Sequence, residues 1–419
     1  MQVETAYKFK LEPTDEQQAL LFKMAGCGRV AYNDSLNLTL HLLKAHFGIG
    51  DKKALYEHLN ALPFAERKAV KKLIPSSAAF NKMLTAWKQT EERAWLSDAF
   101  VDCLQQRQRD FTKAIEGWAN GIRGFPSFRS RRFAHHSTMR FPAPKKQLKI
   151  QHKHIHLPNG LGLVRYRNSR AVVGEWRNAT VSLNATGEWH ISIMCLMEIE
   201  LPKMVSGAAT GIDMGIAKNI TCSTNICGDK GVFAGVHSFR KYQNRLAIEQ
   251  KRLSRKALGS ANWKKQKQKI AKLHQRIANI RRDYQHQTTT QICNNHAMVI
   301  VEALKIKNMS KSAKGDSEQQ GKNVAAKAGL NKRILDQGWG DLRLMLNYKM
   351  ARKGGIYGEV NPKNSSNECA CCGYVDKANR PSQAVFHCLR CGHKENADKN
   401  AAKVILKRYQ VALENPKAA

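Results

Sequence analysis

The chain has 419 residues, and 70 Lys and Arg residues against 33 Asp and Glu residues give it a formal net charge of +37. This length allows roughly two to four domains with substantial cores. So much positive charge repels itself and indicates an anionic partner, and a phosphate backbone fits best because its binding releases counterions. No apolar run approaches the roughly 20 residues that span a bilayer, which argues against a membrane role.

The chain begins with MQVETAYKFKLEPT, which alternates charged and apolar residues. This pattern is typical of neither a signal peptide nor a transit peptide, so we expect an intracellular protein in a reducing compartment. Of the 11 cysteines, five fall within 369–391 and six are scattered singly. This distribution predicts one metal site and ordinary buried thiols, and it argues against a disulfide framework.

The N-terminal half contains a strand, a helical region and then more strands. Residues 3–11 alternate like a strand, and Pro13-Thr14 opens a helical pattern that runs to about residue 44. Further helical stretches cover roughly 52–74 and 76–120. Short alternating runs bounded by Gly, Pro and Asn follow in 138–200, which predicts an all-β region.

Two features of this half leave alternatives open. The segment GIRGFPSFRSRRF (121–133) combines arginines with Phe125, Phe128 and Phe133. It suits phosphate contact with base stacking, but a basic loop with its phenylalanines packed inward fits equally well.

The second feature is His152, His154 and His156, which alternate and would share one face of a strand. A metal site there is the minor hypothesis, because no fourth ligand is evident. A polar strand face turned towards nucleic acid is preferred.

The C-terminal half opens with a strand, a tight turn and a second strand in 207–225. Residues 241–285 carry 14 cations against Glu249 and Asp283, which predicts two helices joined near Gly259-Ser260 with one cationic and one apolar face. Nucleic-acid contact is favoured over a merely solvated face. The apolar face comprises Leu246, Ile248, Leu253, Leu258, Ile270, Leu273, Ile277 and Ile280.

The remaining elements surround the cysteine region. Residues 296–304 have the pattern of a buried strand, and the polar, Gly- and Lys-rich stretch 310–332 predicts a mobile loop. A helix over 333–353 and a strand over 354–362 follow. A last helix begins at about residue 397, and the tail ENPKAA is expected to fray.

The cysteine region has the pattern C-x2-C-x15-C-x2-C, with a glycine after each pair. Two such turns present four thiolates tetrahedrally, as structural Zn²⁺ requires, and leave no open position for catalysis. We therefore predict a zinc site that holds a small domain together. Cys371 is the odd cysteine, and the predicted ligands are Cys369, Cys372, Cys388 and Cys391.

Three acids stand at the ends of predicted elements. Asp213 follows a short apolar strand within Gly-Ile-Asp-Met-Gly, Glu302 ends the run Met298–Val301, and Asp398 lies at the start of the last helix. Each acid alone could be a turn or cap residue. Together they provide the hard oxygen ligands that hydrolysis with two Mg²⁺ ions needs.

These motifs resemble the TnpB family, the transposon-encoded RNA-guided nucleases, and by extension the compact type V CRISPR effectors. The resemblance spans nearly the whole chain. It is carried by AYKFKLEPT, CGRVAYND, GFPSFRS, GIDMG, the basic stretch 252–283, VEALKIKNM, LDQGWGDLR, NPKNSSNECACCG, FHCLRCG and NADKNAA.

The resemblance implies a multidomain α+β fold. A β-barrel-like wedge domain (1–13 and 134–205) would carry an inserted helical recognition lobe (14–133). An RNase H-like, RuvC-type α/β nuclease domain (206–368 and 394–419) would carry an inserted zinc ribbon (369–393). It further implies that Asp213, Glu302 and Asp398 are catalytic Mg²⁺ ligands.

The resemblance also implies an activity, partners and a location. We expect a Mg²⁺-dependent DNA endonuclease that uses a guide RNA from the transposon end and cuts complementary double-stranded DNA beside a short target-adjacent motif. A monomer is favoured, in prokaryotic cytoplasm and at the nucleoid when bound to its target. The alternatives are an RNA-guided DNA-binding regulator with little or no cleavage and a transposase with an RNase H-like core. The order Asp, Glu, Asp disfavours the transposase.

Overall fold

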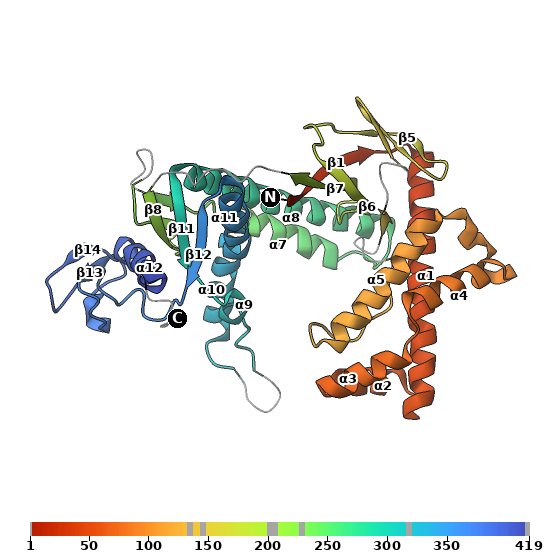
Figure 1. The fold of residues 1–419 in the computed structure, drawn as a ribbon, viewed down its shortest axis with the longest axis horizontal. Helices are drawn as coiled ribbons and strands as arrows, with labels where there is room; N and C mark the ends of the chain where they lie inside the picture. Colours follow the sequence, from red (N-terminus) through yellow and green to blue (C-terminus); the bar gives the residue numbers. More distant parts are fainter. Residues whose placement is uncertain are drawn as a thin grey trace. The chain divides into compact units, whose positions relative to one another are not determined.

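The computed structural model describes residues 2–131, 137–142, 148–198, 208–225, 231–315 and 321–414. The chain divides into two compact units, residues 1–199 and residues 200–419, and together they form a mixed α/β, multidomain protein (Figure 1). In the described ranges, no helix is both long enough and apolar enough to cross a membrane.

The first unit contains one seven-stranded antiparallel sheet in the order β2-β6-β7-β1-β5-β4-β3. Strand β1 joins its two halves, because its first residues pair with β7 and its last two pair with β5. Alternate side chains are buried, as the sequence pattern predicts. The strands are β1 (Gln2–Glu12), β2 (Thr138–Phe141), β3 (Lys149–Gln151), β4 (His154–Leu157), β5 (Gly162–Tyr166), β6 (Glu175–Leu183) and β7 (Trp189–Glu198).

Between β1 and β2 the chain forms a helical region around its own core (Figure 1). The first helix begins with a capping box, in which Thr14 and Gln17 exchange hydrogen bonds of 3.3 and 3.1 Å. The continuous stretches predicted over 52–74 and 76–120 are interrupted, the first at Pro63 and the second by a 3₁₀ segment. The elements are α1 (Asp15–Phe47), α2 (Lys52–Ala61), α3 (Phe64–Leu73), α4 (Ser77–Lys88), η1 (Glu91–Asp98) and α5 (Val101–Ala119).

The prediction of three histidines on one strand face was wrong. Gln151 pairs with His154, so His152 lies in the two-residue turn between β3 and β4, and only His154 and His156 share a strand face. In an unbroken strand His152 would have pointed to the same face as His154 and His156, but here it belongs to the turn.

In the basic segment 121–133 one phenylalanine, Phe125, packs inward, as one of the two alternatives predicted. Phe125 is buried and its ring lies 5.0 Å from that of Trp118, whereas Phe128 is half-buried beneath the ammonium of Lys52. Phe133 lies outside the described residues.

The second unit is built on a five-stranded sheet in the order β10-β9-β8-β11-β12. Strands β8, β11 and β12 are parallel, and β9 and β10 are antiparallel to their neighbours. The strands are β8 (Ala208–Asp213), β9 (Lys218–Cys222), β10 (Val232–Ala234), β11 (His296–Glu302) and β12 (Ile356–Val360); β13 (Val385–His387) and β14 (Lys394–Asn396) form a separate hairpin.

The helices of this unit confirm the predicted basic pair but correct two details. Ile248 and Leu258 are 53% and 85% exposed, so the apolar face of the pair is shorter than predicted. The predicted loop 310–332 ends early, because α10 begins at Val324; residues 316–320 and 415–419 lie outside the described ranges. The helices are α7 (Ser238–Ser254), α8 (Ala261–Asn295), α9 (Ile306–Met309), α10 (Val324–Gln337), α11 (Trp339–Lys353), η3 (Lys377–Asn379) and α12 (Ala397–Glu414).

Helix α12 packs against the sheet at two glycines. A Cβ atom at Gly211 of β8 would lie 2.0 Å from the carbonyl oxygen of Ala402, and one at Gly358 of β12 would lie 2.3 Å from the ring of Tyr409. Gly211 therefore serves close helix packing rather than the turn after β8. This contact brings the start of α12 to the strand that carries Asp213.

Candidate nuclease site and cysteine cluster

Asp213 and Glu302 lie at the same edge of the second sheet. They are the last residues of the parallel neighbours β8 and β11, and the preceding residues, Ile212 and Val301, are partners in the register. Because the carboxyl ends of adjacent parallel strands meet at one edge, the two acids occupy equivalent positions there.

Asp398 lies in the first turn of α12 but does not cap it. The side chain of Asn396 accepts hydrogen bonds from the amides of Asp398 and Lys399, at 3.2 and 3.3 Å, and so performs the capping role. The Asp398 carboxylate lies instead 3.5 Å from a guanidinium nitrogen of Arg380 and 3.7 Å from Nζ of Lys218.

The charges of Glu302 and Asp398 act on Asp213. Burial, with the charges of Glu302 and Asp398, raises the pKa of Asp213 to about 7, although Arg380 opposes the rise. Burial also raises the pKa of Glu302, which is 6% exposed and accepts a 2.6 Å hydrogen bond from Ser365. Both carboxyl groups therefore hold a proton more readily than usual, and a cation bound beside them would favour their charged forms.

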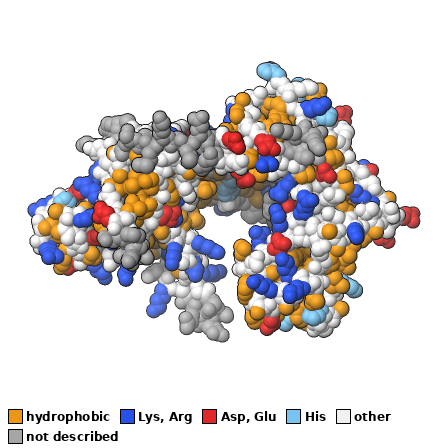
Figure 2. Space-filling model, in the orientation of Figure 1, with side chains coloured by type: hydrophobic (Ala, Val, Ile, Leu, Met, Phe, Trp, Pro, Cys, Tyr) orange, Lys and Arg blue, Asp and Glu red, His pale blue; other side chains and the backbone are white. Residues whose placement is uncertain are grey.

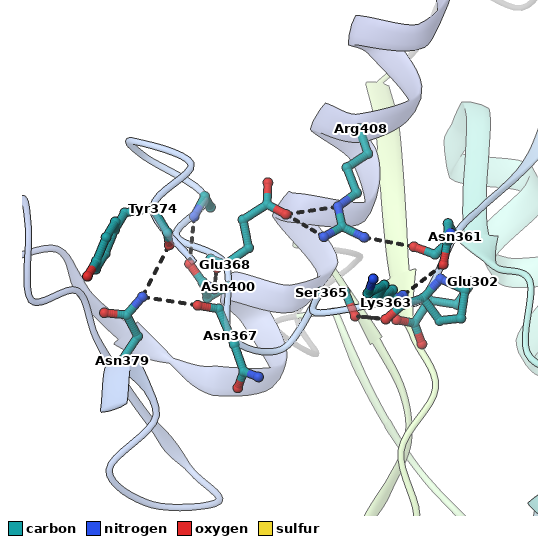
Figure 3. Close-up of polar contacts among 12 residues, drawn as sticks. Glu302, Asn361, Lys363, Ser365, Asn367, Glu368, Tyr374, Asn379, Asn400 and Arg408 are labelled. Carbon is teal, nitrogen blue, oxygen red and sulfur yellow. Dashed lines mark hydrogen bonds and ion pairs between the residues drawn. The ribbon is translucent and has the colours of Figure 1, made fainter. Parts of the chain in front are cut away.

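The segment between β12 and the cysteine cluster is held by α12 (Figure 3). Arg408 binds Glu368 and donates a 2.7 Å hydrogen bond to the carbonyl of Asn361. The buried Asn400 accepts from the amide of Ala370 at 3.0 Å and donates to the carbonyl of Glu368 at 2.7 Å. These bonds fix the segment that presents Ser365 to Glu302.

The four predicted zinc ligands come together. Their sulfur atoms all lie within 4.8 Å of one another, two of the thiols are buried, and the exposed Cys371 is not part of the group. Gly373 and Gly392 have φ of 74° and 72°, a left-handed conformation that glycine adopts easily, and each donates to the carbonyl four residues before it. The group is Cys369, Cys372, Cys388 and Cys391.

Among the described residues, this cysteine cluster is the only group of three or more His, Cys, Asp or Glu side chains close enough to hold an ion. Asp213 and Glu302, at one edge of the second sheet, and Asp398, in the first turn of α12, do not form such a group. His154 and His156 likewise belong to none.

The sequence interpretation missed several polar residues around these sites. Ser365, Arg380 and Arg408 contact the three acids or the segment beside them, and Asn379 is fully buried with its amide bound to the carbonyls of Asn367 and Tyr374. The polar run NPKNSSN was visible in the sequence, but its partners lie up to 63 residues away.

A cavity of about 710 Å³ opens beside the turn that follows Asp213. At its floor, Asp336 accepts hydrogen bonds from the hydroxyl of Ser238 and the amide of Phe239, at 3.1 and 2.9 Å, and thereby caps α7. Gln337 donates to the carbonyl of Ile216 at 3.1 Å. The LDQGWG stretch thus ties α10 to α7 and to the turn after β8.

Comparisons with known sequences identify relatives over the whole chain. Family profiles match residues 192–313 (OrfB_IS605, "Probable transposase"), 339–405 ("Cas12f1-like, TNB domain") and 1–46 ("Helix-turn-helix domain"). In this structure residues 2–46 form the single strand β1 and most of the single helix α1.

Two relatives align over almost their full length. "Putative RNA-guided DNA endonuclease InsQ" of Escherichia coli (strain K12) is 41% identical over 96% of this chain and 91% of its own. "Putative RNA-guided DNA endonuclease" of Streptomyces pristinaespiralis is 32% identical over 97% of this chain and 89% of its own.

Among solved structures, "Cryo-EM structure of the Cas12f1-sgRNA-target DNA complex" covers 97% of this chain and 100% of its own, at 13% identity and a TM-score of 0.34. That likeness is too weak to bear on the fold or function. The sequence relatives are strong enough by themselves, and the chain therefore belongs to the TnpB family of insertion-sequence proteins.

Proposed function

We propose that this chain is an RNA-guided DNA endonuclease that hydrolyses phosphodiester bonds in DNA complementary to its guide. The observation that supports the proposal is that Asp213 and Glu302 end adjacent parallel strands and that the charge of Asp398 in α12 acts on Asp213, in a chain whose relatives are named as such enzymes. The guide would come from the transposon end, and cutting would occur beside a short target-adjacent motif.

The three carboxylates are of the chemical type that would hold Mg²⁺. They are hard oxygen donors, and the charges of Glu302 and Asp398 raise the pKa of Asp213, which a bound divalent cation would relieve. When bound, Mg²⁺ would activate water and stabilise the leaving oxygen. The side chains of Ser365 and Arg380 would orient Glu302 and Asp398. The strand order β10-β9-β8-β11-β12 supports the proposal of an RNase H-like domain.

The cysteine cluster fits Zn²⁺ in a structural role. Four thiolates close the coordination shell, so no position remains for a substrate. We propose that zinc holds the ribbon 369–393, whose apolar cluster among the described residues is small.

For the rest of the chain we propose the roles that the family resemblance implies. The seven-stranded sheet would act as the wedge domain and the helices of 14–133 as the recognition lobe. The described pairings leave β2 and β3 at the ends of the sheet's strand order. Guide RNA and target DNA would account for the net charge of +37.

The test begins with purification of the chain together with its flanking locus and sequencing of the RNA that accompanies it. A dominant RNA with a constant part and a variable end is expected. DNA matching the variable end should then be cut with Mg²⁺ by the wild-type chain and by Asp341→Asn, which changes an exposed acid of α11, but not by Asp213→Ala, Glu302→Gln or Asp398→Ala.

The three inactive variants should still bind guide and target, because only metal ligation is lost. Cutting by any of them would refute the site assignment. Guided binding by the wild-type chain without cutting would instead support the regulator, and the ion pairs that hold Asp398 would then explain the silent site.

A further inference from the structure

The first unit contains a basic cavity of about 650 Å³ between α1, α5 and the loop after α5, which we call the α5 pocket. Figure 2 shows Lys and Arg side chains exposed over the helical part of this unit. The pocket is lined by Tyr32, Arg107, Asp110, Lys113, Ala114, Arg123, Gly124, Phe125, Pro126, Ser127, Arg129 and Thr138.

The α5 pocket holds more positive than negative charge. Its one acid, Asp110, lies 2.9 Å from Arg107 and 3.9 Å from Arg129. Burial and the charge of Arg129 lower the pKa of Arg107 to about 10, although Asp110 opposes this. Lys113 and Arg123 add two further cations.

These two further cations are exposed at the mouth of the pocket. Within the described part of the chain, neither the Lys113 ammonium nor the Arg123 guanidinium forms an ion pair. A cationic site with unpaired charges at its mouth is suited to an anion that arrives from solvent.

The wall of the pocket is fixed rather than loose. The side-chain amide of Asn33 exchanges hydrogen bonds of 3.0 and 2.8 Å with the backbone of Arg129, the hydroxyl of Tyr56 donates to the carbonyl of Pro126, and Asn60 accepts from the amide of Phe125. The Arg129 guanidinium lies 3.7 Å from the centre of the Tyr32 ring. The loop is therefore held to α1 and α2, with its arginine stacked in place.

Two glycines make room for the arginines. A Cβ at Gly117 of α5 would lie 2.7 Å from Nε of Arg123, and one at Gly28 of α1 would lie 3.2 Å from Cγ of Arg107. Both arginine side chains therefore lie against a helix at a glycine, where a larger residue would push the arginine aside. This arrangement positions their charges in the pocket.

We propose that the α5 pocket binds a backbone phosphate of nucleic acid, with Arg129 on its wall and Lys113 and Arg123 at its mouth. Phosphate is the anionic group of the nucleic acids that the proposed function requires, and guanidinium forks match its oxygens. The proposal deepens the proposed function by assigning a phosphate-binding site to the helical lobe, and it rests on that function only for the source of the phosphate.

The test measures binding rather than cleavage. Purified chain free of nucleic acid, without Mg²⁺, is titrated with labelled single-stranded RNA and, separately, with a labelled DNA duplex over a series of salt concentrations. The variant Lys113→Gln/Arg123→Gln should bind about tenfold more weakly, and its logarithmic salt dependence should become shallower by about one to two.

Two further variants distinguish an effect of the pocket itself from a general effect of removing positive charge. Lys72→Gln/Lys82→Gln removes two exposed cations of α3 and α4, and it should change binding much less. Gly117→Ala alters no charge, and its Cβ displaces only the flexible Arg123 side chain, so it should keep the unfolding temperature and weaken binding severalfold.

The outcomes are distinct. Weaker RNA binding alone assigns the pocket to the guide, weaker DNA binding alone assigns it to the target, and loss of both assigns it to the phosphodiester backbone in general. Unchanged binding by the pocket variants, or an equal loss in the control variant, would overturn the proposal. A chain that cuts no DNA but shows the pocket effect would refute the endonuclease and leave the pocket standing.

Discussion

Replacement of Asp213 by asparagine should stabilise the metal-free protein. Asparagine keeps the size of the side chain but removes a carboxylate that is costly to bury beside Glu302 and Asp398. The rise in the pKa of Asp213 from 3.8 to about 7 corresponds, at about 1.4 kcal/mol per pH unit, to at most about 4 kcal/mol of destabilisation of the wild-type chain.

The sign follows from proton binding. Between pH 3.8 and about 7 the folded wild-type chain holds a proton on Asp213 that the unfolded chain has lost, so its stability falls as pH rises through this range. Asp213→Asn cannot titrate at this position, so its stability does not fall with pH for this reason. The difference between the two should therefore be small near pH 4 and reach its full value above pH 7.

The assay is the thermal unfolding midpoint in a chelator at a series of pH values. For a unit of this size each kcal/mol shifts Tm by about 2–4 °C, so the second unit should gain several degrees at pH 8 in Asp213→Asn. The exposed-acid control Asp341→Asn should gain none. Addition of Mg²⁺ should then stabilise the wild-type chain and not the variant.

Two outcomes would contradict this reasoning. Loss of stability in Asp213→Asn at pH 8 would mean that the carboxylate is satisfied by the protein itself. Equal stabilisation of both chains by Mg²⁺ would place the ion elsewhere.

Two further predictions concern the cysteine cluster and the packing of α12. Cys391→Ser should abolish stoichiometric zinc binding and lower the unfolding temperature, whereas Cys371→Ser should leave both unchanged. Elemental analysis and thermal unfolding measure these effects. Zinc retained by Cys391→Ser would count against the site. Gly211→Ala should cost about 3 kcal/mol in the free energy of unfolding, because its Cβ meets the Ala402 carbonyl oxygen. Gly329→Ala in α10 meets no atom within 4 Å and should be neutral or stabilising. Denaturant unfolding measures both, and a harmless Gly211→Ala would show that α12 packs elsewhere.

Much of the first unit follows from local patterns. Strand β1 and helix α1 end within a few residues of their predicted limits, because alternation and a capping box are encoded in adjacent residues. The prediction for His152 was wrong because a two-residue turn without glycine leaves almost no sequence signal. The sequence also did not predict that α10 begins at Val324, because the polar, Gly-containing sequence there is typical of a loop.

The sequence by itself identified the groups to which we assign chemistry: four cysteines at a metal-binding spacing, three acids at element ends and a net charge of +37. Ligand type and spacing are local properties, so a single chain reveals them. Only the tertiary structure decided how these groups meet. The pairing of β8 with β11, the approach of α12 at Gly211, and the ion pair of Asp398 with Lys218 all join residues far apart in the sequence. Such contacts depend on how whole elements pack, and packing is a property of the complete core rather than of any short stretch.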